Sequence, residues 1–280
     1  MTPRAKMEPL AAVEEQILQR LREAENVFCF LDYDGTLAPL AATPDQALPL
    51  PGTAPLLREL ALTPGTRVAL VSGRPIADVR RFLDVPGVYY VGLHGLGVCV
   101  PGGTIEWIED VAAVRATLPE IRAQLQQSLA ARPGVLIEDK GVALACHYRL
   151  ASQADAVLVR QTMAAAVDAH QGKGVPLTLT QGHEVTEIRP TCANKGKTVC
   201  RLLARYSPSA LAIYIGDDQT DEDAFAQLPS ESITIRVGSS TAQTAARYGI
   251  EGPGEVRGFL EAMLEHRCLR IQTAIKASEG

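Results

Sequence analysis

The stretch "FCFLDYDGTLAPL", residues 28–40, begins as a hydrophobic β-strand and ends in two acids, Asp32 and Asp34, that flank one tyrosine. Residues two apart on a strand share a face, and because the chain turns at once, both carboxylates can converge on one small volume. Two unpaired carboxylates this close repel unless a cation or a shared proton lies between them. A hard divalent ion such as Mg²⁺, which takes oxygen ligands, meets this need. An Asx turn closing a strand is the structural alternative for the motif alone.

Short apolar strands alternate with ten-residue helical patterns on both sides of this stretch. The rhythm runs through "TAPLLRELAL", "TRVALVSGR" and "PIADVRRFLDV", and it returns late in "KGKTVCRLLARY" and "LAIYIGDDQTDEDAFAQL". Such alternation is typical of βαβ units and a parallel sheet, in which chemistry collects at the carboxyl ends of the strands. The sequence therefore predicts an α/β protein with a Rossmann-like parallel sheet.

The middle of the chain, residues 106–189, has a different pattern. Its helices and strands are expected in the order αββαββ, with "LTLTQG" and "HEVTEIRP" forming a hairpin. This order indicates an inserted α+β domain with an antiparallel sheet. The core is then discontinuous, formed by residues 1–105 and 190–280, and residues 1–25 read as an amphipathic N-terminal helix. Turn signals place the hinges near Gly102 and Pro190.

A second polar motif, "ALVSGRP", again ends a hydrophobic strand. Ser72 and the backbone amide of Gly73 are the right size to hold phosphate oxygens, with Arg74 as an outer cation. The same residues also form an acceptable helix start, with Ser72 as the cap, so this motif alone decides little.

A third motif, "RPTCANKGKTV", places Lys195 and Lys197 at the start of a helix. A lysine is unfavourable at this end of the helix dipole unless an anion lies near, so the position indicates a phosphate or a cluster of acids. A solvated pair of lysines is the alternative.

The fourth motif, "IYIGDDQTDEDAF", packs five acids into positions 217–223 directly after a strand. Acids in the first turn of a helix are mildly stabilising, but this density at the active edge of a sheet is typical of metal binding.

The four motifs in this order resemble the haloacid dehalogenase superfamily of phosphohydrolases. Within it, "GDDQTDEDAF", "NKGKTV" and "EDKGVALACHYR" are similar to the trehalose-6-phosphate phosphatase family, over about residues 27–260. The resemblance implies a hydrolase core of the haloacid dehalogenase type with an inserted cap domain, 106–189, that carries substrate specificity. It further implies a Mg²⁺-dependent phosphomonoester hydrolase that converts trehalose 6-phosphate to trehalose and phosphate.

In that family the first aspartate of the opening motif is the nucleophile, so the resemblance makes Asp32 the residue that forms an aspartyl-phosphate. Asp34 would protonate the leaving sugar oxygen and then activate water. Ser72 and Lys195 would hold the phosphoryl oxygens, with Gly73 and Arg74 as further contacts. The implied metal ligands are Asp32, Asp34 through its carbonyl, and Asp217, with Asp218 or Asp221 in direct or water-mediated support.

The resemblance also implies sugar contacts in the inserted domain. The candidates are polar residues of its strands and hairpin: Glu138, Lys140, His147, Arg149 and Glu184. Taken without the family, a histidine in an apolar strand such as His147 is more often a satisfied core residue, and Glu184 more often a solvated one.

Composition and charge bound the remaining questions. A net charge of −5 over 280 residues, with scattered cations, argues against a nucleic-acid surface. No apolar run reads as a signal peptide or a membrane span, and the six cysteines show no metal-binding spacing, so buried free thiols in a reducing, cytoplasmic compartment are expected. A monomer is expected, with a functional link to a trehalose-phosphate synthase.

Two other functions remain open at this stage. The same chemistry on another sugar or polyol phosphate, such as sucrose phosphate or mannosylphosphoglycerate, is the nearest one. The other is a catalytically silent regulator that binds a sugar phosphate, although the residues implied to be catalytic are all present.

Overall fold

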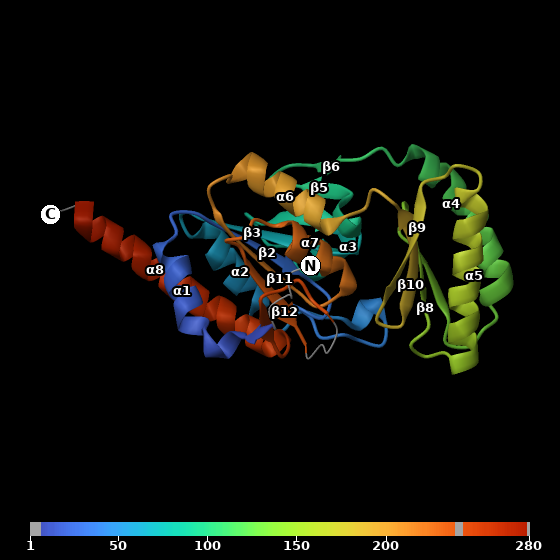
Figure 1. The fold of residues 1–280 in the computed structure, drawn as a ribbon, viewed down its shortest axis with the longest axis horizontal. Helices are drawn as coiled ribbons and strands as arrows, with labels where there is room; N and C mark the ends of the chain where they lie inside the picture. The colour runs from blue at the N-terminus through green and yellow to red at the C-terminus, as the bar shows by residue number, and fades with distance from the viewer. Residues whose placement is uncertain (1–6, 239–242, 279–280) are drawn as a thin grey trace. The chain divides into compact units, whose positions relative to one another are not determined.

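The computed structural model describes residues 7–238 and 243–278, which divide into two compact units (Figure 1). The second unit comprises Ala41–Gln46 and Trp107–Asn194, and the first comprises the rest of the described chain. The segment Ala41–Gln46 lies outside the predicted insertion 106–189.

A nine-stranded sheet forms the centre of the first unit, in the order β1-β13-β12-β11-β2-β3-β4-β5-β6. Neighbours from β1 to β4 pair in parallel, whereas β4 and β5 are antiparallel. The predicted parallel α/β sheet is therefore confirmed. In chain order the strands are β1 (Glu8–Pro9), β2 (Val27–Asp32), β3 (Thr66–Val71), β4 (Tyr89–Gly92), β5 (Gly97–Cys99), β6 (Ile105–Trp107), β11 (Leu211–Gly216), β12 (Ile233–Val237) and β13 (Tyr248–Ile250).

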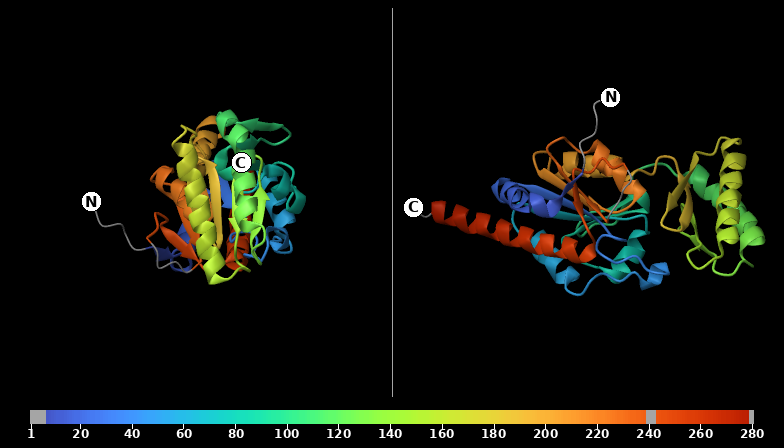
Figure 2. Two further views of the ribbon diagram at one scale, coloured as in Figure 1. Left: turned by 90° about the vertical axis from the view of Figure 1, so that its right-hand side faces the viewer. Right: turned by 60° about the horizontal axis from the view of Figure 1, so that its bottom comes forward.

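Helices accompany this sheet in two groups, visible in Figures 1 and 2. In one group α1 and α2 both pack against α8, and in the other α6 packs against α7. The helices of this unit are α1 (Glu14–Glu23), α2 (Thr53–Leu62), α3 (Ile76–Phe82), α6 (Lys195–Tyr206), α7 (Glu222–Gln227) and α8 (Pro253–Ser278), and its short 3₁₀ turns include η3 (Leu93–Gly95) and η4 (Gln219–Asp221). The 3₁₀ turn η2 (Pro44–Gln46) belongs to the second unit.

The N-terminal helix is shorter than the predicted 1–25. Residues 1–6 lie outside the described part of the chain, and α1 covers Glu14–Glu23. Glu8 and Pro9 instead form β1, which pairs in parallel with β13. Proline has no amide hydrogen to donate and fixes φ, so it suits the edge of a sheet better than a helix interior.

The central strand β2 is buried along its whole length. It lies between β11 and β3, so both of its edges are paired. A strand covered on both faces reads as a continuous apolar run, which explains "VFCFL". Burial of a large side chain such as Phe28 or Phe30 contributes about 1.5–3 kcal/mol, and this fixes the position at which Asp32 ends the strand.

The second unit has a four-stranded antiparallel sheet in the order β7-β8-β10-β9. Its elements are α4 (Ala112–Leu129), β7 (Leu136–Asp139), β8 (Leu144–His147), α5 (Gln153–Gln171), β9 (Leu177–Gly182) and β10 (Val185–Pro190). The predicted order αββαββ is confirmed. Side chains of α4 and α5, such as Ile121 and Val159, form a buried core with Leu144 and Ile188 of the strands. Because side chains alternate along a strand, the opposite face of this sheet carries the polar residues.

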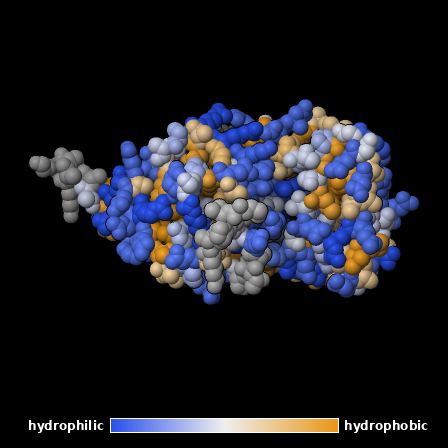
Figure 3. Space-filling view, viewed as in Figure 1, coloured by the Kyte–Doolittle hydropathy of each residue, from blue (hydrophilic) through white to orange (hydrophobic). Residues whose placement is uncertain are grey.

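Hydrophilic residues cover most of the face shown in Figure 3, with small separate hydrophobic areas between them. Within the described residues, none of the helices has the length and apolar character needed to cross a membrane.

Candidate active site

The nucleophile candidate Asp32 is the last residue of β2 and is 4% exposed. A tight turn follows, in which Tyr33 O accepts hydrogen bonds from the amides of Leu37 and Ala38. Gly35 adopts a φ of 76° in this turn, and a Cβ there would overlap the carboxylate of Asp217. The "DGT" sequence thus serves two needs, because glycine permits both the left-handed backbone and the close approach of a second acid.

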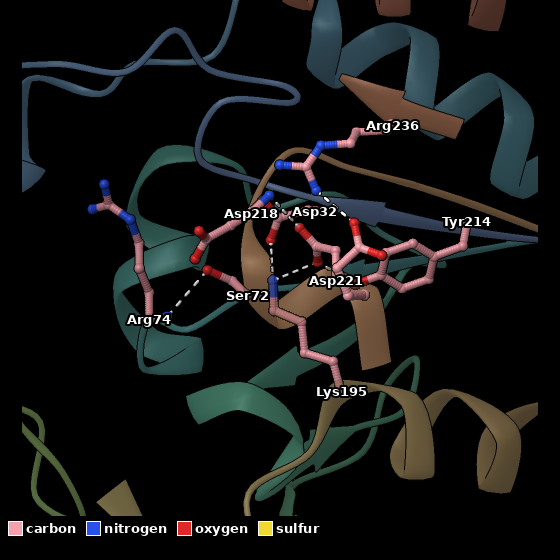
Figure 4. A network of polar contacts seen from close by, with 9 residues as sticks. Asp32, Ser72, Arg74, Lys195, Tyr214, Asp218, Asp221 and Arg236 are labelled. Atoms are coloured by element: carbon pink, nitrogen blue, oxygen red, sulfur yellow. Dashed lines mark hydrogen bonds and ion pairs between the residues drawn. The ribbon is translucent and has the colours of Figure 1, made fainter. Parts of the chain in front are cut away.

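Lys195 is the first residue of α6 and is buried, with 2% of its surface exposed. Its Nζ donates to Oδ1 of Asp32 and to Oδ1 of Asp221, both at 2.7 Å (Figure 4). Lys195 therefore neutralises acids, as its unfavourable position at the helix start predicts. The alternative of a lysine exposed to solvent is wrong for Lys195.

Three acids meet beside this lysine, and we call Asp32, Asp217 and Asp221 the acid cluster. They are buried, and one ligand atom from each lies within 4.8 Å of the others. Asp217 follows β11 directly, and Asp221 ends the turn η4. Strand ends of β2 and β11, which are neighbours in the sheet, thus place acids from two distant motifs together.

Asp221 is held at both carboxylate oxygens. Its Oδ1 accepts from Lys195 and from the Tyr214 hydroxyl, each at 2.7 Å, and its Oδ2 accepts from the Asp218 amide at 2.9 Å. The Asp218 side chain completes a reciprocal capping box with the backbone of Asp221. Asp218 itself is only partly buried, so it lies at the margin of the acid cluster.

The acid cluster holds more carboxylates than cations. Burial and the carboxylates of Asp221 and Asp218 raise the pKa of Asp217 to about 8. Burial and the neighbouring Asp221 also raise the pKa of Asp32 well above its usual range. Burial works to lower the pKa of Lys195, but Asp221 and Asp32 raise it above its ordinary value, so this side chain stays protonated. Hard carboxylate oxygens with surplus negative charge are a donor set that fits a divalent cation.

The second motif lies at the end of β3, beside Asp32. The Ser72 hydroxyl is buried and accepts a hydrogen bond from the Arg74 amide at 3.1 Å. Helix α3 begins later, with Pro75 at its N-cap, so Ser72 does not cap it. Gly73 is half-buried, and a Cβ there would lie 2.5 Å from the imidazole of His94. The turn is therefore closely packed from one side.

Arg74 reaches Asp34 across forty positions of sequence. Its Nε and Nη2 donate to the two carboxylate oxygens of Asp34 at 2.8 and 2.6 Å, and its guanidinium lies 5.3 Å from the ring centroid of Tyr33. Asp34 is thus turned toward this arginine rather than folded back onto its own turn, as the Asx alternative requires.

Three of the five predicted sugar contacts gather on the polar face of the second unit's sheet, which we call the open face because it lies opposite the face that α4 and α5 cover. Glu138 accepts from His147 Nε2 at 2.7 Å, and Lys140 Nζ lies 2.8 Å from Oε2 of Glu187. Burial would raise the pKa of Glu138, but the His147 bond and Lys140 lower it. Glu187, on β10, is buried and was not among the sequence candidates, although it stands opposite Ala145 and Thr180 in the middle of the sheet.

The other two predicted contacts lie apart from this group. Glu184 occupies the β9–β10 turn with a φ of 57°, and its side chain is 56% exposed. Arg149 Nε lies 3.6 Å from it, and Arg149 Nη2 donates to the His183 carbonyl at the same turn. This pair marks the hairpin end of the sheet.

The sheet of the first unit carries acids at the carboxyl ends of adjacent parallel strands, with a lysine at a helix start beside them, and an α+β unit is inserted in the chain. Together these features define the haloacid dehalogenase class of fold. The model of the trehalose-phosphatase family matches residues 30–253. The chain belongs to this family.

Relatives support that assignment. A trehalose-phosphate phosphatase of Mycobacterium marinum is 37% identical over 239 residues, which cover 82% of this chain and 59% of the relative. The chain thus spans 59% of the length of that curated protein.

Solved structures share the fold. The C-terminal domain of a trehalose-6-phosphate phosphatase from C. albicans matches 94% of this chain and 99% of its own length, with a TM-score of 0.82 and 23% identity. The C-terminal domain of a trehalose synthase regulatory protein from Candida albicans matches 91% of this chain and 99% of its own length, with a TM-score of 0.73 and 14% identity. The fold alone therefore does not separate an enzyme from a regulator.

Proposed function

We propose that this chain hydrolyses trehalose 6-phosphate to trehalose and phosphate. The observation that carries the proposal is the buried ion pair of Asp32 with Lys195 beside two further acids, in a member of the trehalose-phosphatase family. A regulator that only binds sugar phosphate has no need for a buried carboxylate nucleophile held next to surplus negative charge.

In this proposal Asp32 attacks phosphorus, and the bond between phosphorus and the sugar oxygen breaks as the aspartyl-phosphate forms. Asp34 donates a proton to the departing sugar oxygen. It then takes a proton from the water molecule that attacks the aspartyl-phosphate, which releases phosphate and restores Asp32. Arg74 orients Asp34 through its two hydrogen bonds.

Ser72, the Gly73 amide and Lys195 hold the phosphoryl oxygens during transfer. Lys195 lies between Asp32 and Asp221, so its ammonium is already in place when charge shifts onto the phosphoryl group.

The acid cluster is proposed as the site of Mg²⁺. Asp32, Asp217 and the backbone carbonyl of Asp34 would hold the ion, and bound Mg²⁺ supplies neutralisation of the carboxylates and of the phosphate dianion. Asp221 is assigned a supporting role, because donors already occupy both of its carboxylate oxygens. Asp218 supports Asp221 through the capping box.

The inserted domain, residues 106–189, is proposed as the cap domain that supplies the sugar contacts. Paired donors and acceptors on one sheet face suit the many hydroxyls of a disaccharide. The proposed contacts are the open-face residues Glu138, Lys140, His147 and Glu187, with Arg149 and Glu184 at the hairpin end.

A panel of sugar phosphates tests the substrate. Phosphate release is measured from trehalose 6-phosphate, sucrose phosphate and mannosylphosphoglycerate with Mg²⁺ present. The proposal expects kcat/KM for trehalose 6-phosphate to exceed the others by at least about tenfold. Comparable turnover of all three would replace it with a general sugar phosphatase, and binding without turnover would favour the regulator.

We further propose that the protein acts in the cytoplasm as a monomer, beside a trehalose-phosphate synthase that supplies its substrate. The six cysteines, all within the described residues, form no disulfide bond, which suits a reducing compartment.

A further inference from the structure

Tyr214 lies in β11, fully buried, and has no role in the chemistry described so far. It shares a face of the strand with Gly216, since side chains alternate. A Cβ at Gly216 would overlap the Asp221 side chain, so this glycine leaves a slot through which Asp221 extends back to the Tyr214 hydroxyl. The bond from that hydroxyl to Oδ1 of Asp221 measures 2.7 Å (Figure 4).

Other buried tyrosines of the first unit satisfy their hydroxyls in a simpler way. Tyr33 donates to the carbonyl of Ala47, and Tyr90 donates to the carbonyl of Leu83. A backbone carbonyl is therefore sufficient to bury a phenol in this sheet. The Tyr214 hydroxyl instead donates to a carboxylate oxygen that also accepts from Lys195, which ties it to the acid cluster.

The shared oxygen determines where Lys195 lies. Oδ1 of Asp221 accepts from both Tyr214 and Lys195 at 2.7 Å, and Lys195 also reaches Oδ1 of Asp32 at 2.7 Å. An oxygen that accepts two donors attracts each of them less strongly than it attracts a single donor. The tyrosine hydroxyl thus weakens the pull of Asp221 on Lys195 and leaves the ammonium shared with Asp32.

We propose that Tyr214 is a positioning residue for phosphoryl transfer: its bond to Asp221 keeps Lys195 shared between Asp221 and Asp32. The inference rests on the proposed function. Without the hydroxyl, Lys195 moves toward Asp221, and Asp32 loses the cation that orients it and that holds the transferring phosphoryl group. The effect reaches the reaction through two side chains, so it alters the chemical step more than substrate binding.

The test compares Tyr214→Phe with Tyr90→Phe. Both variants remove one buried hydroxyl from the same sheet, and the Tyr90 hydroxyl bonds backbone groups of the 83–85 segment, away from the acid cluster. In the first variant the phenyl ring would keep the edge contact that Tyr214 makes with Phe225, at 5.6 Å between centroids. Tyr214→Phe is expected to lower kcat for trehalose 6-phosphate about tenfold with KM changed less than about twofold, the size of one hydrogen bond to a charged group. Tyr90→Phe is expected to keep kcat within about twofold, while its thermal stability falls by about as much as that of Tyr214→Phe.

A second readout needs no turnover. Beryllofluoride with Mg²⁺ forms a tetrahedral adduct on an aspartate in place of a phosphoryl group, and its binding raises the unfolding temperature. Wild type and Tyr90→Phe should show the same rise, and Tyr214→Phe a smaller one, because Lys195 no longer holds a fluorine of the adduct.

The outcomes distinguish the positioning role of Tyr214 from the proposed function of the protein. A Tyr214→Phe variant with the wild-type kcat and the wild-type beryllofluoride response overturns the positioning role. Equal losses of kcat in both variants also overturn it, since they indicate a general effect of sheet stability. A wild type that releases no phosphate but responds to beryllofluoride overturns the proposed function alone, and the response of Tyr214→Phe still decides the role of Tyr214. A wild type with neither property overturns both.

Discussion

The acid cluster of the first unit and the open sheet face of the second unit differ in how their charges are balanced. The acid cluster holds three buried carboxylates, and Lys195 pairs with two of them, Asp32 and Asp221. On the open face Lys140 pairs with Glu187, and Glu138 pairs with His147. A surplus of buried charge requires a cation, whereas paired charges can exchange partners with neutral hydroxyls. This difference suits the two tasks that we propose for these regions, phosphoryl transfer and sugar recognition.

Removal of divalent metal has the largest expected effect, because it acts on the acid cluster, where negative charge is in surplus. Excess chelator should reduce phosphate release below detection, since the acid cluster cannot accept a phosphate dianion without a cation. Added Mg²⁺ should restore the rate. Full activity in excess chelator would contradict the assignment of the acid cluster as a metal site.

A single methyl group at Gly35 should disturb the acid cluster almost as strongly. Gly35→Ala places a Cβ against the Asp217 carboxylate, and a displacement of about 1 Å costs about 100-fold in kcat/KM. Gly52→Ala is the matched control, because Gly52 has a φ of 88° but no atom within 4 Å of the added Cβ. If the two variants lose activity equally, backbone strain and not the position of Asp217 is responsible.

Changes on the open face should alter recognition and leave the chemical step intact. Glu138→Gln weakens the bond to His147 and should raise KM for trehalose 6-phosphate about tenfold with kcat within about twofold. Hydrolysis of p-nitrophenyl phosphate, which has no sugar, should be unaffected. Glu120→Gln on α4, a residue with a 55% exposed side chain paired with Lys173, is the control. A fall in kcat on both substrates would place Glu138 in the chemical step instead.

The pH dependence of stability should also distinguish the two regions. A pKa of about 8 at Asp217 in the folded chain lies above the ordinary value of 3.8, so the folded state binds more protons between these values. Stability of the metal-free chain should therefore fall as the pH rises from about 4 to about 8, by up to about 1.4 kcal/mol per pH unit, and level off above.

Urea unfolding at several pH values, with chelator and with Mg²⁺, measures this slope. Mg²⁺ should flatten it by favouring the ionised carboxylates. Without metal, Asp217→Asn should reduce the slope but not abolish it, because burial and Asp221 also raise the pKa of Asp32. A slope unchanged by Asp217→Asn would show that Asp217 is not its source.

The sequence predicted the placement of those residues whose position follows from local pattern. Asp32 and Asp217 end hydrophobic runs, and Lys195 starts an amphipathic helix. Parallel strands place such residues along one edge of a sheet, so their meeting could be expected from chain order alone. The αββαββ order of the insertion was predictable for the same reason, since it rests on the period of apolar residues.

Contacts that depend on partners across the fold were not predictable. Tyr214 looks like an ordinary core residue until Gly216 opens the slot for Asp221, and Glu187 looks like a solvated residue until the strand order places Lys140 beside it. The pairing of Arg74 with Asp34 joins two loops whose approach depends on β2 and β3 being neighbours. Long-range contacts of this kind leave no local signal in a single sequence.

The most direct test of the central claim is the initial rate of phosphate release from trehalose 6-phosphate, with Mg²⁺, by wild type and by Asp32→Asn. The account predicts release by wild type and a rate at least about 10⁴-fold lower for the variant, because the amide cannot form the aspartyl-phosphate. No release by wild type, or a variant rate within about tenfold of wild type, would contradict it.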